Sequence, residues 1–410
     1  MTGIFTLEAL PARKGDSLIL HYGTKAAPKL VVIDGGPSKV YQPALRPRLL
    51  DIRAARGIVD NDPLDIDLLM ISHIDDDHIK GILEFAKELK ESDDLHRPKF
   101  ARIATLWHNA FDDIIGNSDI PTTVTASLAS MGSADFPPGT DPDMAFILTS
   151  VRQGRDLRGY AEALQWETNN PFDPLVMMAK PDDPDVTRFG GGLSFRVIGP
   201  RRDELVELQE HYDKFLRDNN LGRDSPEAAL AATQDASVPN LSSIVTLAEV
   251  GGKTILLTGD ALGSKVTEAL QERGMTGAAA PLKVDVLKMP HHGSDRNVTP
   301  EFFRLIKADH YVFCGDGAHG NPERATLEML FAEQGADPVT LHFTYTVEKI
   351  DKKRKKEAEK HGDAWDQATQ SLATLFECEK AAGRDFMLME PTDRTGVRVD
   401  LLDPIAVPMQ

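Results

Sequence analysis

The stretch His73-Ile74-Asp75-Asp76-Asp77-His78 decides most of what the sequence predicts about the fold. It directly follows the hydrophobic segment 68–71, which predicts a strand, and it precedes apolar positions spaced like one face of a helix from Ile79 to Leu89. Two imidazoles and three carboxylates so close together would repel one another unless a cation held them. We therefore expect a strand-to-helix loop that binds metal. The alternative is an exposed acidic helix cap, because Asp commonly precedes a helix.

Two later segments carry metal-ligating residue types at the ends of expected strands. The expected strand 254–258 ends in Gly259-Asp260, and the expected strand 284–288 is followed by Pro290-His291-His292-Gly293-Ser294. Taken alone, the first is typical of a turn and the second of a polar loop. Three ligand-rich strand ends in one chain are harder to explain separately, so together they predict a binuclear metal centre. Nitrogen and oxygen ligands of this kind suit zinc, manganese or iron and require no thiolate.

These motifs resemble those of a known fold family. HIDDDH, LLTGDA and LKMPHHGS, with the early GDSLIL strand and the IDGG turn, resemble the metallo-β-lactamase fold. They are most similar to the hydrolase domain of the ComEC/Rec2 DNA-uptake proteins and its stand-alone soluble relatives, in which HxDxDH replaces the usual HxHxDH. The resemblance covers most of residues 5–330. It implies an α/β (α+β) fold class, a four-layer αββα sandwich, and metals at the edge where strand ends converge.

The resemblance also implies which side chains bind metal. The implied ligands are His73, Asp75, Asp77, His78, Asp260, His291 and His292. The first two would hold one ion and the next two a second, with Asp260 bridging both. One of the two adjacent histidines would complete the set, and the sequence leaves open which. Two divalent ions, zinc or manganese, would lower the pKa of a shared water and generate hydroxide near neutral pH, with Asp77 also accepting a hydrogen bond from it.

The segment Gly315-Asp316-Gly317-Ala318-His319-Gly320-Asn321-Pro322 resembles the family's NxYGHP loop but departs from it. His319 stands at the aromatic position and Asn321 at the histidine position. Either His319 acts as the general acid, or Asn321 hydrogen-bonds a substrate oxygen without donating a proton. Asn240 either faces the site or is a turn residue. We expect Asp16 and Asp34 to fix loops rather than bind metal.

The expected organisation is a single domain over residues 1–410. The Pro- and Asp-rich stretch 111–188 shows only modest helical periodicity and predicts an insertion, helical or irregular. An amphipathic helix is expected at about 203–218. Residues 346–410 read as a C-terminal extension with a helix and closing strands, in which the charge-dense run 352–360 precedes a helix that reaches Phe376. That run is typical of a solvated helical face.

The amino-acid composition limits which partners and which cellular compartment we expect for this protein. The chain has 46 Lys and Arg against 64 Asp and Glu, a formal charge of −18, which disfavours extended duplex nucleic acid because DNA is bound chiefly through cations. Its two cysteines, Cys314 and Cys378, form no CxxC motif, which favours a reducing compartment. The sequence shows neither a secretory signal nor an apolar run of roughly 20 residues. We expect a soluble, cytoplasmic protein without a membrane partner.

The favoured function is metal-dependent hydrolysis of phosphodiesters, as a phosphodiesterase or nuclease acting on short single-stranded or small nucleotide substrates. The alternative enzyme class is hydrolysis of carboxylic esters, lactones or amides, since fold does not fix function. An alternative of another class is a partner-binding module, in which a structural metal site is retained and residues 111–188 dock another protein. No GxSxG elbow occurs, so a serine nucleophile is not indicated. The oligomeric state stays open.

Overall fold

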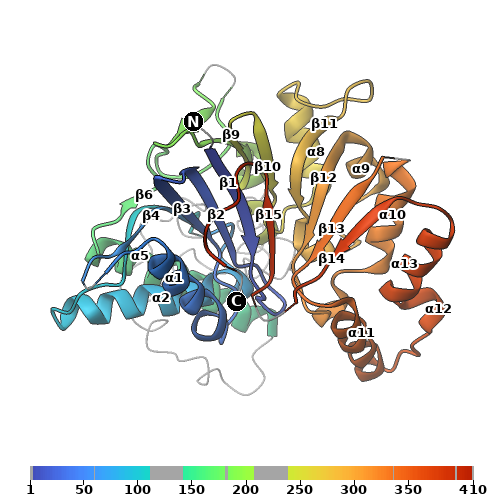
Figure 1. Cartoon of the computed structure of the whole chain (residues 1–410), viewed down its shortest axis with the longest axis horizontal. Helices are drawn as coiled ribbons and strands as arrows, with labels where there is room; N and C mark the ends of the chain where they lie inside the picture. The colour runs from blue at the N-terminus through green and yellow to red at the C-terminus, as the bar shows by residue number, and fades with distance from the viewer. Residues whose placement is uncertain are drawn as a thin grey trace, which may run out of the picture.

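Two mixed β-sheets lie face to face with helices on their outer sides (Figure 1). This arrangement comes from a computed structural model, which describes residues 3–59, 61–110, 142–180, 183–206, 239–335, 337–392 and 395–408. The predicted α/β class with two packed sheets and outer helices is therefore confirmed.

The first sheet is built mainly from the N-terminal part of the chain. Its described strands follow the order β15 (Val397–Asp400), β1 (Gly3–Ala9), β2 (Leu18–Thr24), β3 (Ala27–Ile33), β4 (Leu64–Met70), β5 (Ala101–Trp107) and β6 (Glu167–Thr168). Strands β3 to β6 run parallel, and β15, β1 and β2 are antiparallel to their neighbours. The parallel strands end at one edge, which places the residues after β3 and β4 together.

The second sheet has the same division into antiparallel and parallel parts. Its described strands follow the order β14 (Phe386–Met389), β13 (Val339–Phe343), β12 (Ile306–Phe313), β11 (Leu282–Lys288), β10 (Lys253–Leu257), β9 (Val245–Val250), β8 (Ser194–Gly199) and β7 (Val186–Arg188). Strands β10 to β14 are parallel. A hydrogen bond from Ile244 N to Ser72 O (2.7 Å) joins the start of β9 to the loop after β4.

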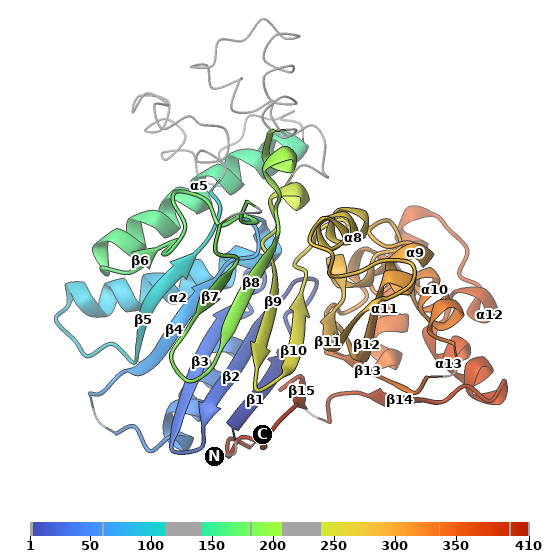
Figure 2. The same ribbon diagram turned by 90° about the horizontal axis from the view of Figure 1, so that it is seen from above.

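Three hydrophobic clusters separate the four layers. Residues of both sheets, such as Leu68 and Val286, form the cluster between the sheets. A second cluster lies under α1 (Arg46–Ala55), α2 (Asp76–Asp94) and α5 (Pro142–Ala163). A third lies on the other outer face, under helices that include α8 (Gly263–Glu272), α9 (Pro300–Leu305), α10 (Arg324–Gln334), α11 (Val347–His361) and α13 (Leu372–Ala381). Figure 2 shows α5 beside α2, in agreement with the contacts between these helices.

Helix α2 begins earlier than expected. It starts at Asp76, so three residues of the HIDDDH segment form its first turn and only the first three lie in the loop. Asp75 is the N-cap residue, with extended backbone, but its side chain accepts no capping hydrogen bond. Burial of Ile79, Ile82 and Phe85 on one side explains why this helix docks on the sheet. The carboxylate of Asp75 is therefore not used for capping and can take part in the candidate site. This differs from the alternative expectation of an exposed acidic helix cap.

Other boundaries also differ from the sequence expectations. The charged run 352–360 lies inside α11 rather than before a helix, and α11 ends at a left-handed Gly362. The helix expected to continue to Phe376 is split into the short α12 (Gln367–Gln370) and α13. The expected helix 203–218 lies outside the described residues beyond position 206. None of the helices in the described part of the chain has the length and apolarity of a membrane span.

The described part of segment 111–188, for which a helical or irregular insertion was expected, contains one helix and two short strands. Residues 111–141 lie outside the description, whereas α5 is a helix of 22 residues and β6 and β7 extend one edge of each sheet. The C-terminal residues supply α11 to α13 and two closing strands, of which β15 pairs with β1 and β14 with β13.

The position of α2 on the first sheet depends on a close contact between Gly81 and Gly35. This contact gives a first prediction. A Cβ at Gly81 would stand 1.9 Å from the carbonyl oxygen of Gly35, so Gly81→Ala must push α2 away from the IDGG turn. We expect the free energy of unfolding to fall by about 1–3 kcal/mol or more. In the matched control, Gly159→Ala in α5, a Cβ meets nothing within 4 Å, and stability should rise slightly. Urea unfolding of both variants measures this, and equal stabilities would contradict the account.

Candidate metal centre

The candidate centre lies where strand ends of both sheets meet. Asp34 follows β3, the segment 73–78 follows β4, Asp260 follows β10, and His291 and His292 follow β11. The two sheets are tied together here, since His291 N donates to Gly259 O (3.2 Å) and a Cβ at Gly259 would stand 2.9 Å from the Ser72 side chain. This close approach brings the three predicted ligand segments to one place.

His78 is fully buried and connects both sheets. Its Nδ1–H donates to Asp34 Oδ2 (2.8 Å), and its Nε2 lies 3.3 Å from Asp260 Oδ2. Asp34 is held in turn by the backbone N–H (2.8 Å) and hydroxyl (2.7 Å) of Ser72. Asp34 thus fixes the ring of His78 and the loop after β4, in agreement with the role expected for it.

The two adjacent histidines both face Asp260 but differ in burial. His292 Nε2 lies 3.3 Å from Asp260 Oδ2, its Nδ1–H donates to Asp16 Oδ1 (3.1 Å), and its side chain is 3% exposed. His291 Nε2 lies 3.7 Å from the same oxygen, its Nδ1–H donates to Asn297 Oδ1 (2.9 Å), and its side chain is 34% exposed. Both have left-handed backbone, with φ of 45° and 57°. The inner position of His292 makes it the better ligand candidate.

Several buried ring nitrogens in the centre have no hydrogen-bond partner. The Nε2 atoms of His73, His78 and His292 are orphaned in this way, and so is Asp75 Oδ1. Buried polar atoms are nearly always satisfied, so several such atoms facing one another suit a cation that all could bind. In the described residues, four groups of three have ligand atoms within 4.8 Å of one another. Two of them consist of predicted ligands, namely His73, His78 and Asp260, and Asp77, His78 and His292, and the other two include Asp16. The donor set therefore fits divalent metal ions.

The geometry groups the expected ligands somewhat differently from the sequence pattern. His73 lies with His78 and Asp260, whereas Asp75 belongs to neither group; its Oδ2 is 4.0 Å from His73 Nε2. Asp77 Oδ2 lies 4.0 Å from His292 Nε2. All seven predicted side chains nevertheless lie in the same region of the molecule.

The surroundings shift the pKa values of these side chains in opposite directions. Burial lowers the pKa of His73 to about 3, and the neighbouring His78 adds to this effect. Burial also disfavours the charged form of His292, but Asp260 and Asp16 outweigh it and raise its pKa to about 9. Burial raises the pKa of Asp75 to about 8, with the charge of Asp77 contributing. Protons thus occupy the metal-free centre, where they compensate its carboxylates.

Lys288 is a buried cation that the sequence analysis did not identify. Its ammonium contacts the carboxylate of Asp16, donates to Gly259 O (2.9 Å) and lies 3.7 Å from Asp260 Oδ1. Burial works against its charge, but Asp16 and Asp260 raise its pKa. A lysine at the end of an apolar strand is a usable signal, because a fully buried lysine requires an acidic partner. Asp16 therefore holds both Lys288 and His292, as a loop-fixing carboxylate would.

The predicted catalytic side chains lie at the edge of the centre. The amide nitrogen of Asn321 donates to His291 O (3.3 Å), and its Oδ1 is buried without a partner. His319 has left-handed backbone (φ 54°), and burial together with Lys14 lowers its pKa, which leaves the imidazole neutral at pH 7. Asn240 Nδ2 lies 3.5 Å from His291 Nδ1, so Asn240 faces the site.

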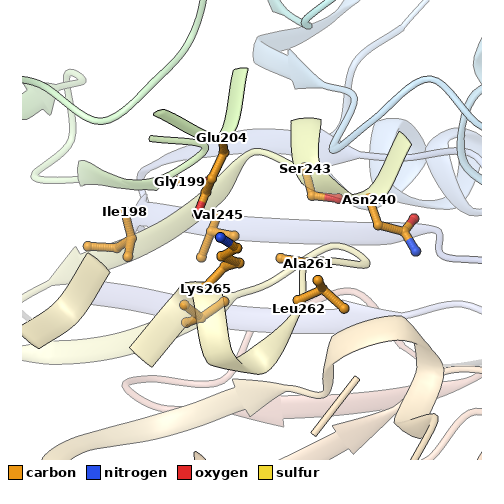
Figure 3. A pocket seen from close by; sticks show the side chains of 10 residues that line it. Ile198, Gly199, Glu204, Asn240, Ser243, Val245, Ala261, Leu262 and Lys265 are labelled. Carbon is orange, nitrogen blue, oxygen red and sulfur yellow. The ribbon is translucent and has the colours of Figure 1, made fainter. Parts of the chain in front are cut away.

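A small, mainly apolar pocket adjoins the centre. Ile198, Val245 and Leu262 line it together with Asn240 and Ala261 (Figure 3). Because Ala261 follows Asp260 and Asn240 contacts His291, these two residues form the wall shared with the centre. The volume of this pocket is about 10 Å³, which is room for about one water molecule.

Comparison with known proteins gives short or distant similarities. No family model matches the sequence. Human microtubule-associated protein 1A is 41% identical over 63 residues, which are 15% of this chain and 2% of that protein. ComE operon protein 3 of Bacillus subtilis is 25% identical over 190 residues, which are 45% of this chain and 22% of that protein. The chain thus spans at most 22% of these relatives, and the ComEC-type subtype stays a prediction.

Solved structures with a similar arrangement include metal-binding proteins. The match to a protein named as a metal-dependent hydrolase from Parabacteroides distasonis covers 82% of this chain and 92% of that one, with 9% identity and a TM-score of 0.34. The metallo-β-lactamase fold protein YhfI from Bacillus subtilis (9%, covering 97% and 99%) gives 0.37, and zinc-bound PqqB from Methylobacterium extorquens (11%, covering 97% and 100%) gives 0.39. TM-scores below 0.5 carry no argument about the fold. The assignment to the α/β class with two packed sheets depends on the strand order of the two sheets.

The raised pKa values predict how the stability of the metal-free protein depends on pH. Between pH 6.5 and 8, folded His292 and Asp75 retain protons that the unfolded chain has lost, so stability falls as pH rises, by up to about 1.4 kcal/mol per pH unit for each proton. Urea unfolding in the presence of a chelator tests this. Asp75→Asn should give a shallower decline, and a stability that is flat or rises over this window would contradict the assignment.

Lys288 gives a second prediction for the metal-free protein. Lys288→Met leaves the buried carboxylates of Asp16 and Asp260 without their cation, which should cost about 3–5 kcal/mol of unfolding free energy. The matched control is Lys253→Met, which breaks the pair with Asp285 (2.5 Å) at a lysine 41% exposed and should cost at most about 1 kcal/mol. Chemical unfolding of both variants measures the two losses of unfolding free energy. Similar losses in the two variants would refute a special role for Lys288.

Proposed function

We propose that this chain is a metal-dependent hydrolase that cleaves phosphodiester bonds. The observation that carries the proposal is the convergence of orphaned, buried Nε2 atoms with the Asp77 and Asp260 carboxylates at one edge of the sandwich. In this proposal Asp77, His78 and His292 hold one ion. His73 and Asp260 hold the second, with Asp75 as the nearest further carboxylate. Zinc or manganese suits this donor set.

Divalent ions bound here would supply positive charge to an ester oxygen and lower the pKa of a bound water. The chain's own residues would orient the reactants. Asp77 lies on the more exposed side, with its side chain 13% exposed, and its Oδ2 can accept a hydrogen bond from the attacking water. Asp34, Asp16 and Asn297 hold the Nδ1 atoms of the three histidines that face Asp260, which keeps each Nε2 directed inward.

Protonation of the leaving group distinguishes among possible substrates. Neutral His319 is a poor proton donor at pH 7, and the Asn321 amide is occupied by a backbone carbonyl. A nucleotide's sugar-oxygen leaving group would therefore have to take its proton from water, whereas a substrate such as a nitrophenyl ester, whose leaving group needs no proton, should react fastest. With a formal charge of −18, short single-stranded or small nucleotide substrates fit this chain better than extended duplex.

A second candidate is hydrolysis of small carboxylic esters or lactones. The pocket beside Asp260 does not support it, because a volume of about 10 Å³ has room for about one water molecule, so this function stays a prediction from the sequence. A partner-binding role for segment 111–188 stays a prediction, since residues 111–141 lie outside the described part of the chain.

The test uses purified protein supplied with manganese or zinc and bis(p-nitrophenyl) phosphate, whose leaving group needs no acid. We expect turnover by the wild type and a loss of at least about 100-fold in Asp77→Ala and Asp260→Ala. Asp65→Asn serves as the control, because Asp65 lies on β4 but pairs with Arg102 at the surface (2.7 Å). Equal rates in the wild type and both site variants would refute the proposal. Turnover of p-nitrophenyl acetate or a lactone alone would favour the second candidate.

A further inference from the structure

Exposure divides the centre into a floor and a rim. We call five side chains with at most 3% exposure the floor: His73, His78, Asp260, Lys288 and His292. The equally buried Asp16 and Asp34 lie behind them and hold His292 and His78. We call the more exposed side chains the rim: Asp77 (13%), Asp75 (20%), His291 (34%) and Lys14 (37%). Among the described residues, the rim is the exposed side of the centre, so a substrate would approach from there. The rim side chains are therefore the ones placed to touch it.

Lys14 is held at the rim by a well-anchored loop between β1 and β2. The loop is closed by a hydrogen bond from Leu10 N to Ser17 O (2.9 Å), and Arg13 N donates to Tyr345 Oη (2.7 Å). A Cβ at Gly15 would stand only 1.8 Å from Asp77 O, so the loop backbone rests directly on the first turn of α2. This contact fixes the position of Lys14 beside Asp77.

The charges around Lys14 leave its ammonium available to a ligand. Its Nζ lies 3.6 Å from Asp77 Oδ2, beyond hydrogen-bond distance, and more than a third of the side chain is exposed. The charge of Lys14 also acts on Asp75, which belongs to the rim, and on His319, which does not. Lys288 differs completely, because it is buried and already bound to Asp16 and Gly259 O. Of these two lysines, only Lys14 can contact a substrate.

We propose that Lys14 binds an anionic oxygen of the substrate phosphate and so selects phosphodiesters over uncharged esters. This inference depends on the proposed function. An oxygen hydrogen-bonded to Nζ at about 2.8 Å would lie no more than about 6.4 Å from Asp77 Oδ2, so the phosphate would bind at the rim of the centre. The flexible lysine stem allows the ammonium to follow the phosphate during the reaction. The acidic chain thereby presents a cation where an anionic substrate enters.

The experiment compares the wild type with Lys14→Met and Lys14→Arg, each loaded with manganese and checked for equal metal content. We expect KM for bis(p-nitrophenyl) phosphate to rise about 10-fold or more in Lys14→Met, with a smaller change in kcat, because one charge-assisted hydrogen bond is lost. Calorimetric titration with inorganic phosphate should show a Kd weakened by a similar factor. Lys14→Arg should restore most of both. Lys25→Met is the control, since Lys25 is 60% exposed and lies next to Asp403.

Two results would overturn the inference. One is an unchanged KM and phosphate Kd in Lys14→Met, and the other is a loss of bound metal in that variant, which would make Lys14 part of the centre's construction. Failure of the proposed function looks different, because the wild type itself would then not cleave the diester. In that case the phosphate titration still decides, since a wild-type Kd no tighter than that of Lys14→Met would overturn the role of Lys14.

Discussion

The Asp260 carboxylate is the group on which the geometry of the centre depends. Its Oδ2 lies 3.3 Å from Nε2 of both His78 and His292 and 3.7 Å from that of His291, so side chains from two sheets face one oxygen. The rings point there because their Nδ1 atoms are bound from behind, by Asp34 and Asp16 on other loops and by Asn297 six residues along the same loop. Burial of these polar and charged groups is unfavourable unless hydrogen bonds and opposite charges compensate it. Here the hydrogen bonds to the Nδ1 atoms and the nearby cations provide that compensation.

Charge balance explains why a pair of divalent ions suits this site. The carboxylates in and behind the centre are Asp16, Asp34, Asp75, Asp77 and Asp260, and the cations beside them are Lys288 and Lys14. With neutral histidines, three negative charges remain uncompensated. Without metal, the raised pKa values of His78, His292 and Asp75 let protons supply the missing charge. Two divalent ions would replace those protons and leave a slight positive excess, which favours an anionic substrate.

Sequence reasoning predicted those parts of the site that are signalled locally. The HIDDDH segment, Asp260 and the adjacent histidines follow apolar strands, and their positions at strand ends made their convergence predictable. The contacts of Lys288 with Asp16 and of Asn297 with His291 were not predicted. Lys288 lies far from Asp16 in sequence, and Asn297 sits in an irregular loop without a distinctive pattern. The start of α2 was also missed, because polar residues in a first helical turn resemble a loop in composition.

Anomalous X-ray scattering at the zinc edge, from crystals of the purified protein grown with zinc, tests the central claim most directly. The account predicts two peaks inside the centre, one bound by Asp77, His78 and His292 and one by His73 and Asp260, at about 2.0–2.2 Å from the ligand atoms. Crystals with abundant zinc in which the centre shows no peak, and in which these side chains turn away from Asp260, would contradict it.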